Sequence, residues 1–80
     1  MAKPNEERKK LIKQLNQVTT RLQILDMIEE RLIKMKELAE RVLSESLTDE
    51  EIENINHQVQ ELVKEVELLD TAPTEYTYHP

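Results

Sequence analysis

Apolar residues recur at spacings of three and four along most of the chain, which is the period of an amphipathic α-helix. Towards the C-terminus they form a heptad row: Ile52, Ile55, Val59, Leu62, Val66 and Leu69. A row with the same spacing and length lies upstream: Leu25, Ile28, Leu32, Met35, Ala39 and Val42. One antiparallel register pairs every member of the two rows, for example Leu32 with Leu62 and Met35 with Val59. The pattern therefore predicts an all-α fold, an antiparallel, coiled-coil-like helical hairpin.

The first helix of this hairpin is expected over about residues 5–43. No proline occurs between Pro4 and Pro73, and the intervening sequence is rich in residues that favour helix. Two serines, at positions 44 and 46, then interrupt the pattern and compete for backbone hydrogen bonds. A helix of this length extends roughly 60 Å.

The second helix is expected over about residues 49–70. Thr48 followed by Glu51 is the signature of a capping box, in which side chain and backbone exchange hydrogen bonds at a helix start. Residues 1–70 then form one hairpin domain. Residues 71–80 contain two prolines, and we expect an extended C-terminal tail there.

The first helix outruns the second by about twenty residues, and the apolar stripe continues on this extension. Its members are Leu11, Leu15, Val18 and Leu22, flanked by Ile12. Where the stripe meets the hairpin row the spacing shortens to three and three, at Leu22, Leu25 and Ile28, which predicts a local change of supercoil. Neither predicted helix obviously covers the extension, and the alternative is that Tyr76 and Tyr78 of the C-terminal tail fold back over it.

The hairpin half of the first helix also has more apolar surface than one partner helix buries. Four residues widen its apolar arc to about 160°: Ile24, Met27, Leu38 and Leu43. A two-helix core in a chain of this size is small, because such chains bury only about 60% of their unfolded surface. We therefore expect self-association or docking onto a helical partner protein.

Charge is distributed unevenly along the chain. Residues 1–21 carry six basic and two acidic groups, whereas residues 48–80 carry one basic and nine acidic groups. An antiparallel dimer or four-helix assembly would bring these opposite ends together. Lys9, Lys10 and Lys13 are expected to guide an acidic partner. No aromatic residue interleaves with them, so we do not expect nucleic-acid binding.

The composition argues against catalysis and cofactor chemistry. The chain has no glycine, which removes the phosphate-binding loops of nucleotide enzymes, and no cysteine, which removes thiolate nucleophiles and cysteine zinc sites. His57 and His79 are far apart in the sequence and have no matching partners for a metal site. No apolar run approaches the roughly 20 residues of a membrane span. We expect no catalytic residue, no metal or cofactor, and no membrane insertion.

The stretch from about Leu15 to Asp70 resembles the N-terminal rod segment of bacterial flagellins. Residues 32–39, LIKMKELA, are similar to the family's L-Q-R-M-R-E-L-A, and residues 47–51, LTDEE, are similar to its S-D-x-D/E at the next helix start. The resemblance implies a long helix followed by a shorter antiparallel one. The segments that precede the rod and the C-terminal helix that completes it have no counterpart here, so a chain of this kind would be a cut-down relative.

These observations favour a non-catalytic structural or assembly protein that acts through helix–helix packing. Its interaction residues would be the apolar extension and the basic residues beside it. The partner would be a second copy, or a flagellar or other helical protein. Location would be cytoplasmic, or outside the cell with the flagellum if the flagellin resemblance holds. The alternative is a small cytoplasmic adaptor or regulator that binds a partner protein through the same surface. An enzyme resembling the helical chorismate mutases would need several cations on different helices, and the second helix supplies only Lys64.

Overall fold

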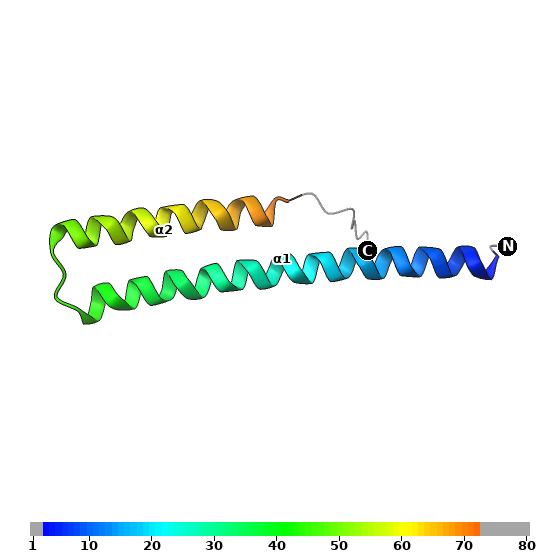
Figure 1. The fold of residues 1–80 in the computed structure, drawn as a ribbon, viewed down its shortest axis with the longest axis horizontal. Helices are drawn as coiled ribbons and strands as arrows, with labels where there is room; N and C mark the ends of the chain where they lie inside the picture. Colours follow the sequence, from blue (N-terminus) through cyan, green and yellow to red (C-terminus); the bar gives the residue numbers. More distant parts are fainter. Residues whose placement is uncertain (1–2, 73–80) are drawn as a thin grey trace.

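The computed structural model describes residues 3–72, which form two antiparallel helices lying side by side (Figure 1). Helix α1 spans Pro4–Ser44 and α2 spans Asp49–Asp70. The described part of the chain contains no strand, and the predicted all-α helical hairpin is confirmed. The molecule is an elongated rod, 69 Å long and 19 by 18 Å across, because α1 extends well beyond the end of α2.

Helix α1 begins and ends within one residue of its predicted bounds. Pro4 occupies the first turn, where its missing N–H costs nothing, and Glu6 and Glu7 lie at the positive end of the helix dipole. At the other end the Ser44 hydroxyl donates to the Glu40 carbonyl at 2.8 Å, and Glu45 turns to an extended conformation. The helix therefore ends without a glycine.

Helix α2 begins with the predicted capping box. The Thr48 hydroxyl accepts a hydrogen bond from the Glu51 N–H at 3.1 Å, and the Glu51 carboxylate accepts one from the Thr48 N–H at 3.3 Å. Both bonds satisfy groups that have no partner within the helix. The helix ends at Asp70, where the Thr71 N–H donates to the Glu67 carbonyl. Residues 73–80 of the predicted tail lie outside the described residues.

The face of α2 that packs on α1 is the predicted one. Ile55 is buried, with 5% of its surface exposed, and Val59, Leu62, Val66 and Leu69 are half-buried. Ile52 begins this row but is largely exposed, since it lies near the end of the hairpin. Together these six residues form the inner row of α2.

The face of α1 that packs on α2 differs from the prediction by a rotation of the helix. Its inner row consists of Ile24, Ile28, Arg31, Met35, Leu38 and Val42, of which Leu38 is buried and Val42 is the most exposed. Ile28, Met35 and Val42 were predicted correctly. Leu25, Leu32 and Ala39 were not, because all three are exposed and Leu32 keeps 50% of its surface in solvent.

Two cross-helix ion pairs give a physical reason for this rotation. The Arg31 Nε lies 3.4 Å from a Glu65 carboxylate oxygen, and an Arg21 guanidinium nitrogen lies 3.5 Å from an Asp70 carboxylate oxygen. Both arginines reach these acids only when their side of α1 faces α2. The rotation also buries Leu38, which is longer than the Ala39 that the predicted face would have placed there. The register itself agrees with prediction to within about one turn, since Arg31 lies beside Glu65 and Leu32 was expected opposite Leu62.

The hairpin has a small core. Among the described residues only Leu38 and Ile55 are buried, and many large apolar side chains remain exposed. Two helices that touch along one face each leave the rest of their surface in water. The exposed apolar residues are therefore the main feature that the fold leaves unexplained.

Candidate assembly surface

The N-terminal part of α1 projects beyond α2 as a single helix. The ion pair between Arg21 and Asp70 marks where α2 ends, so residues 4–20 of α1, hereafter the overhang, have no described helix beside them. The predicted interaction residues Leu11, Ile12, Leu15, Val18 and Leu22 lie on or next to it, and all are exposed, with Leu11 at 65%. Leu11, Ile12 and Leu15 also line a shallow hollow with Pro4, Glu7 and Arg8.

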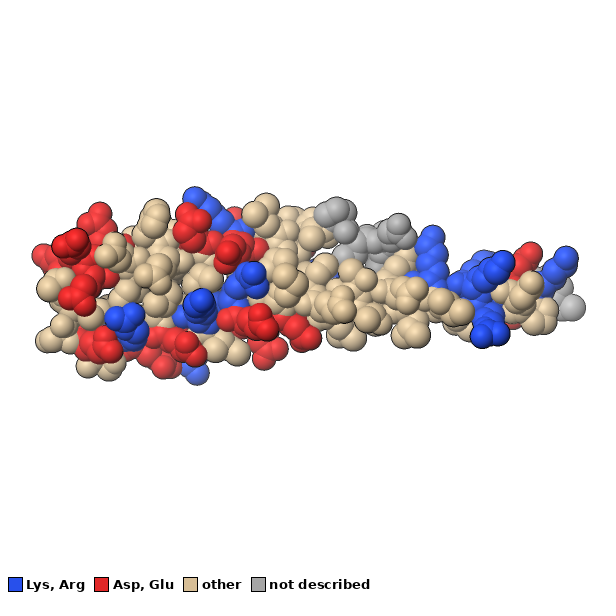
Figure 2. Space-filling model, in the orientation of Figure 1, with Lys and Arg blue, Asp and Glu red and all other residues tan. Residues whose placement is uncertain are grey.

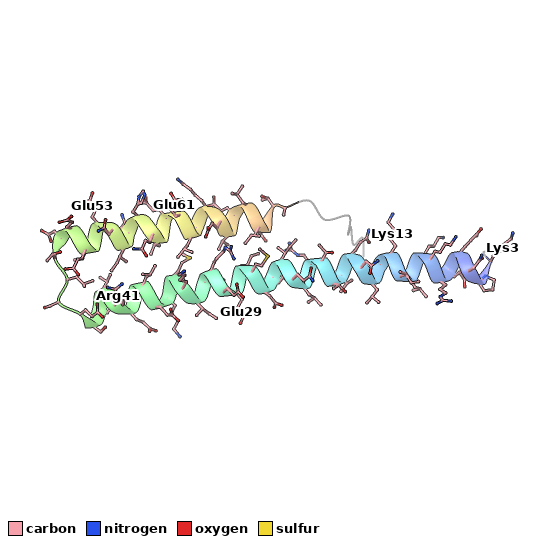
Figure 3. The ribbon with its side chains drawn as sticks, in the orientation of Figure 1. Lys3, Lys13, Glu29, Arg41, Glu53 and Glu61 are labelled. Atoms are coloured by element: carbon pink, nitrogen blue, oxygen red, sulfur yellow. The ribbon has the colours of Figure 1, made fainter. Side chains whose placement is uncertain are left out.

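The apolar stripe of the overhang continues along the whole of α1 as a second heptad row. Its members alternate at spacings of four and three and all are exposed: Leu11, Leu15, Val18, Leu22, Leu25, Glu29, Leu32, Lys36, Ala39 and Leu43. We call this set the outer row. From Leu25 to Leu43 each member follows an inner-row residue by one position, so the outer row lies about 100° around the helix from the face that packs on α2. Glu29, one of its two charged members, points away from α2 (Figure 3).

The predicted change of supercoil at Leu22, Leu25 and Ile28 stays a prediction. Leu22 and Leu25 belong to the outer row, whereas Ile28 belongs to the inner row. The short spacing arose because two regular rows were joined into one. Helix α1 runs unbroken through this point, and each row keeps its heptad spacing across it.

An apolar groove opens at the hairpin tip, the end where the two helices are linked. Its volume is about 600 Å³. It is lined by Ala39, Val42 and Leu43 of α1 and by Asp49, Ile52, Glu53, Ile55, Asn56 and Val59 of α2. Ala39 and Leu43 belong to the outer row, so the groove adjoins the C-terminal end of that row. Leu43 is 87% exposed at its edge.

A second hollow between the helices has a different character. It is lined by Glu30, Arg31 and Lys34 of α1 and by Leu62 and Glu65 of α2. Four of these five side chains are charged, and the pair Arg31–Glu65 crosses the hollow. A helix with an apolar face would therefore bury more apolar surface in the groove at the hairpin tip than in this hollow.

The predicted basic residues lie on the overhang, beside the apolar row. Lys9, Lys10 and Lys13 are exposed, and no ion pair within residues 3–72 involves them. Figure 2 shows basic side chains at the free end of α1 and acidic side chains gathered around the hairpin tip. The charge separation expected from the sequence is thus a separation along the length of the rod.

The helix-start acids and His57 belong to no group that could hold a metal ion within residues 3–72. Within the described range no three His, Cys, Asp or Glu side chains are grouped so that they could hold a metal ion. Glu51 is engaged in the capping box, and His57 is exposed on α2. Across residues 3–72, neither helix combines the length and apolar composition of a bilayer span.

The prediction from the sequence missed two parts of this surface. The continuation of the outer row beyond Leu22 was missed because Leu25, Leu32 and Ala39 were assigned to the contact with α2. The groove was missed because it depends on the rotation of α1. Leu43 was predicted only to widen the apolar arc of the first helix. Its four-residue spacing from Ala39 could have placed it in the same row as Ala39.

No protein-family model, curated protein or solved structure matches this chain.

Proposed function

We propose that this chain is a non-catalytic structural or assembly protein that works by helix–helix packing through the exposed face of α1. The supporting observation is the outer row, whose exposed members from the overhang to the hairpin tip are apolar except for Glu29 and Lys36. Contiguous apolar surface of this kind marks interaction sites in proteins that stay in solution. The order of a long helix and a shorter antiparallel one is similar to that of flagellins. The specific form of this proposal is therefore a structural protein of the flagellum, acting there or in the cytoplasm.

The alternative function is a small cytoplasmic adaptor or regulator. It would use the same outer row to hold a helix of a partner protein, in the manner of an amphipathic helix in a groove. The basic residues of the overhang would then favour an acidic partner and raise its association rate. The two hypotheses differ in the identity of the protein bound, not in the surface that binds it.

The test is capture of binding proteins from a host lysate by the unmodified chain and by a variant of the outer row. Leu15→Glu combined with Leu22→Glu places two charges in the row, which an apolar contact cannot accommodate without large cost. Asn16→Glu combined with Gln23→Glu is the matched control, because it adds the same charge at the same seven-residue spacing on another face of α1. Circular dichroism checks that both variants remain helical.

We expect the unmodified chain and the control to capture the same protein and the outer-row variant to lose it. Mass spectrometry identifies that protein. A flagellin or another flagellar component supports the structural role, whereas a cytoplasmic protein unrelated to flagella supports the adaptor role. Identical capture by all three chains would show that the outer row is not the working surface.

A further inference from the structure

The outer row can receive a helix without displacing α2. Since it lies about 100° around α1 from the inner row, a helix packed on it would be a second neighbour of α1 rather than a competitor of α2. Helices that belong to larger bundles have two such faces. The position of the outer row, as well as its apolar character, therefore allows α1 to bind a second helix while α2 stays in place.

The outer row is complementary to itself when it is reversed. A copy aligned end to end would bring Leu11 against Leu43 and Leu15 against Ala39, and the two-fold symmetry of the pair would repeat each contact. Near the middle, Leu22 would meet Leu32. The contact would extend for about 48 Å, since the row spans 32 helical steps.

The two charged members of the outer row are compatible with this alignment. Lys36 would meet Val18 of the copy, and its long aliphatic stem can cover apolar surface while its ammonium group stays in water. Glu29 would meet Leu25 close to the symmetry axis. A single polar residue at such a position lowers stability but disfavours other registers.

Charge complementarity selects the same antiparallel alignment. This alignment places residues 9–13 of one copy at the level of residues 41–45 of the other, beside the start of α2. The overhang offers Arg8, Lys9, Lys10 and Lys13, and the hairpin tip offers Glu45, Asp49, Glu50, Glu51 and Glu53 (Figure 2). A parallel pair would instead place the two basic overhangs together, which costs energy.

We propose that the partner of the outer row is a second copy of this chain, packed antiparallel along α1, so that each overhang covers the apolar groove at the hairpin tip of the other copy. Leu11, Ile12 and Leu15 supply the apolar face that enters the groove, and Asp49 and Glu53 at its rim meet the lysines of the overhang. The result is a four-helix assembly in which the two α1 helices form the central pair. This inference deepens the proposed function by naming the partner, and it rests on that function.

Disulfide trapping tests the orientation directly, because the chain has no cysteine of its own. One chain carries Leu11→Cys and another carries Leu43→Cys, both at exposed positions where the change spares the hairpin. The two are mixed in a glutathione redox buffer, and the products are separated without reductant and identified by mass. Arg41→Cys replaces Leu43→Cys in the matched control, since it is two residues away and on nearly the opposite side of α1.

We expect the mixed disulfide of Leu11→Cys with Leu43→Cys to exceed the amount that random pairing gives. Leu11→Cys alone should form almost no disulfide, because its two thiols lie roughly 48 Å apart in the antiparallel pair. The control mixture should show no such enrichment. Efficient coupling of Leu11→Cys to itself would instead indicate a parallel pair and overturn the proposal.

Sedimentation separates this proposal from the function on which it rests. A dimer that becomes monomeric in the Leu15→Glu/Leu22→Glu variant, but not in the Asn16→Glu/Gln23→Glu control, supports it. An unmodified chain that stays monomeric at micromolar concentration ends the proposal of a second copy. If that monomer still captures another protein through the outer row, the proposed function stands; if it captures none, both fail.

Discussion

Arg31 occupies an inner-row position where a heptad pattern favours an apolar side chain. Its guanidinium donates to the Met27 carbonyl at 2.9 Å through one terminal nitrogen, while its Nε lies 3.4 Å from Glu65 and is buried without a hydrogen bond. This ion pair gains little net stability, because half of the Glu65 side chain stays in solvent, which weakens the attraction, and one Arg31 donor remains unsatisfied. Its contribution is to orient α1, since it holds this side of the helix against α2.

Replacing Arg31 by leucine should raise the free energy of unfolding by about 1 kcal/mol, because apolar contact with α2 replaces a poorly satisfied ion pair. The same change at Arg21, at the open end of the hairpin, should alter stability by less than about 0.5 kcal/mol because that pair is solvated. Urea unfolding followed by circular dichroism measures both. A loss of stability in Arg31→Leu would mean that the ion pair itself supports the hairpin.

The two leucines Leu38 and Leu32 provide the sharpest test of how α1 is rotated. Leu38→Ala should lower the free energy of unfolding by about 2–5 kcal/mol, the usual loss for a buried leucine. Leu32→Ala should cost less than about 1 kcal/mol in the monomer, because half of that side chain is already exposed. Both changes are made in the Leu15→Glu/Leu22→Glu background, so that assembly does not bury Leu32. The reverse order of the two effects would restore the face predicted from the sequence.

At the scale of elements, the start of α2 is fixed by local chemistry. The Thr48–Glu51 exchange involves residues three apart, and Asp49, Glu50 and Glu51 all lie in the first turn. No distant contact is needed to specify it. This is why the sequence predicted the capping box and the helix bounds correctly.

Thr48→Ala should therefore lower stability by about 0.5–2 kcal/mol, since it removes the acceptor for the Glu51 N–H. Thr48→Ser retains a hydroxyl and should stay within a few tenths of a kcal/mol of the unmodified chain. Thermal unfolding compares the three proteins. Equal losses in the alanine and serine variants would indicate that the methyl group of Thr48, not its hydroxyl, is what matters.

The rotation of α1, by contrast, could not be decided from spacing. The predicted and observed faces share Ile28, Met35 and Val42, and both satisfy a heptad repeat. The choice between them depends on contacts across the hairpin, such as Arg31 with Glu65, and on the depth at which Leu38 packs. The sequence prediction chose Leu32 over Arg31 because it considered only hydrophobicity. Part of the outer row was therefore assigned to the contact with α2 and part to the interaction surface of the overhang.

At the scale of the whole molecule, the overhang is mainly basic and the hairpin half of the rod is mainly acidic (Figure 2). Within residues 3–72 no acidic group of α2 lies beside the overhang, because α2 ends at the level of Arg21. The proposed antiparallel partner would place an acidic surface beside the overhang, and the charged groups are exposed on both surfaces. Electrostatic attraction at such an interface depends on ionic strength, since the Debye length falls from about 10 Å at 0.1 M salt to about 3 Å at 1 M.

The antiparallel dimer should therefore weaken as salt rises, while its apolar contacts keep it from dissociating completely. Lys10→Glu should raise the dissociation constant and reduce this salt dependence, because it removes one attraction at each end of the dimer. Mixing Lys10→Glu with Glu53→Lys should restore part of the affinity, since the two altered side chains meet at one end of the mixed pair. Sedimentation equilibrium over a range of salt concentrations measures all three proteins. A dimer that strengthens steadily with salt would show that apolar contact dominates and that the charges of the overhang do not face the hairpin tip, because salt promotes apolar association and screens opposite charges.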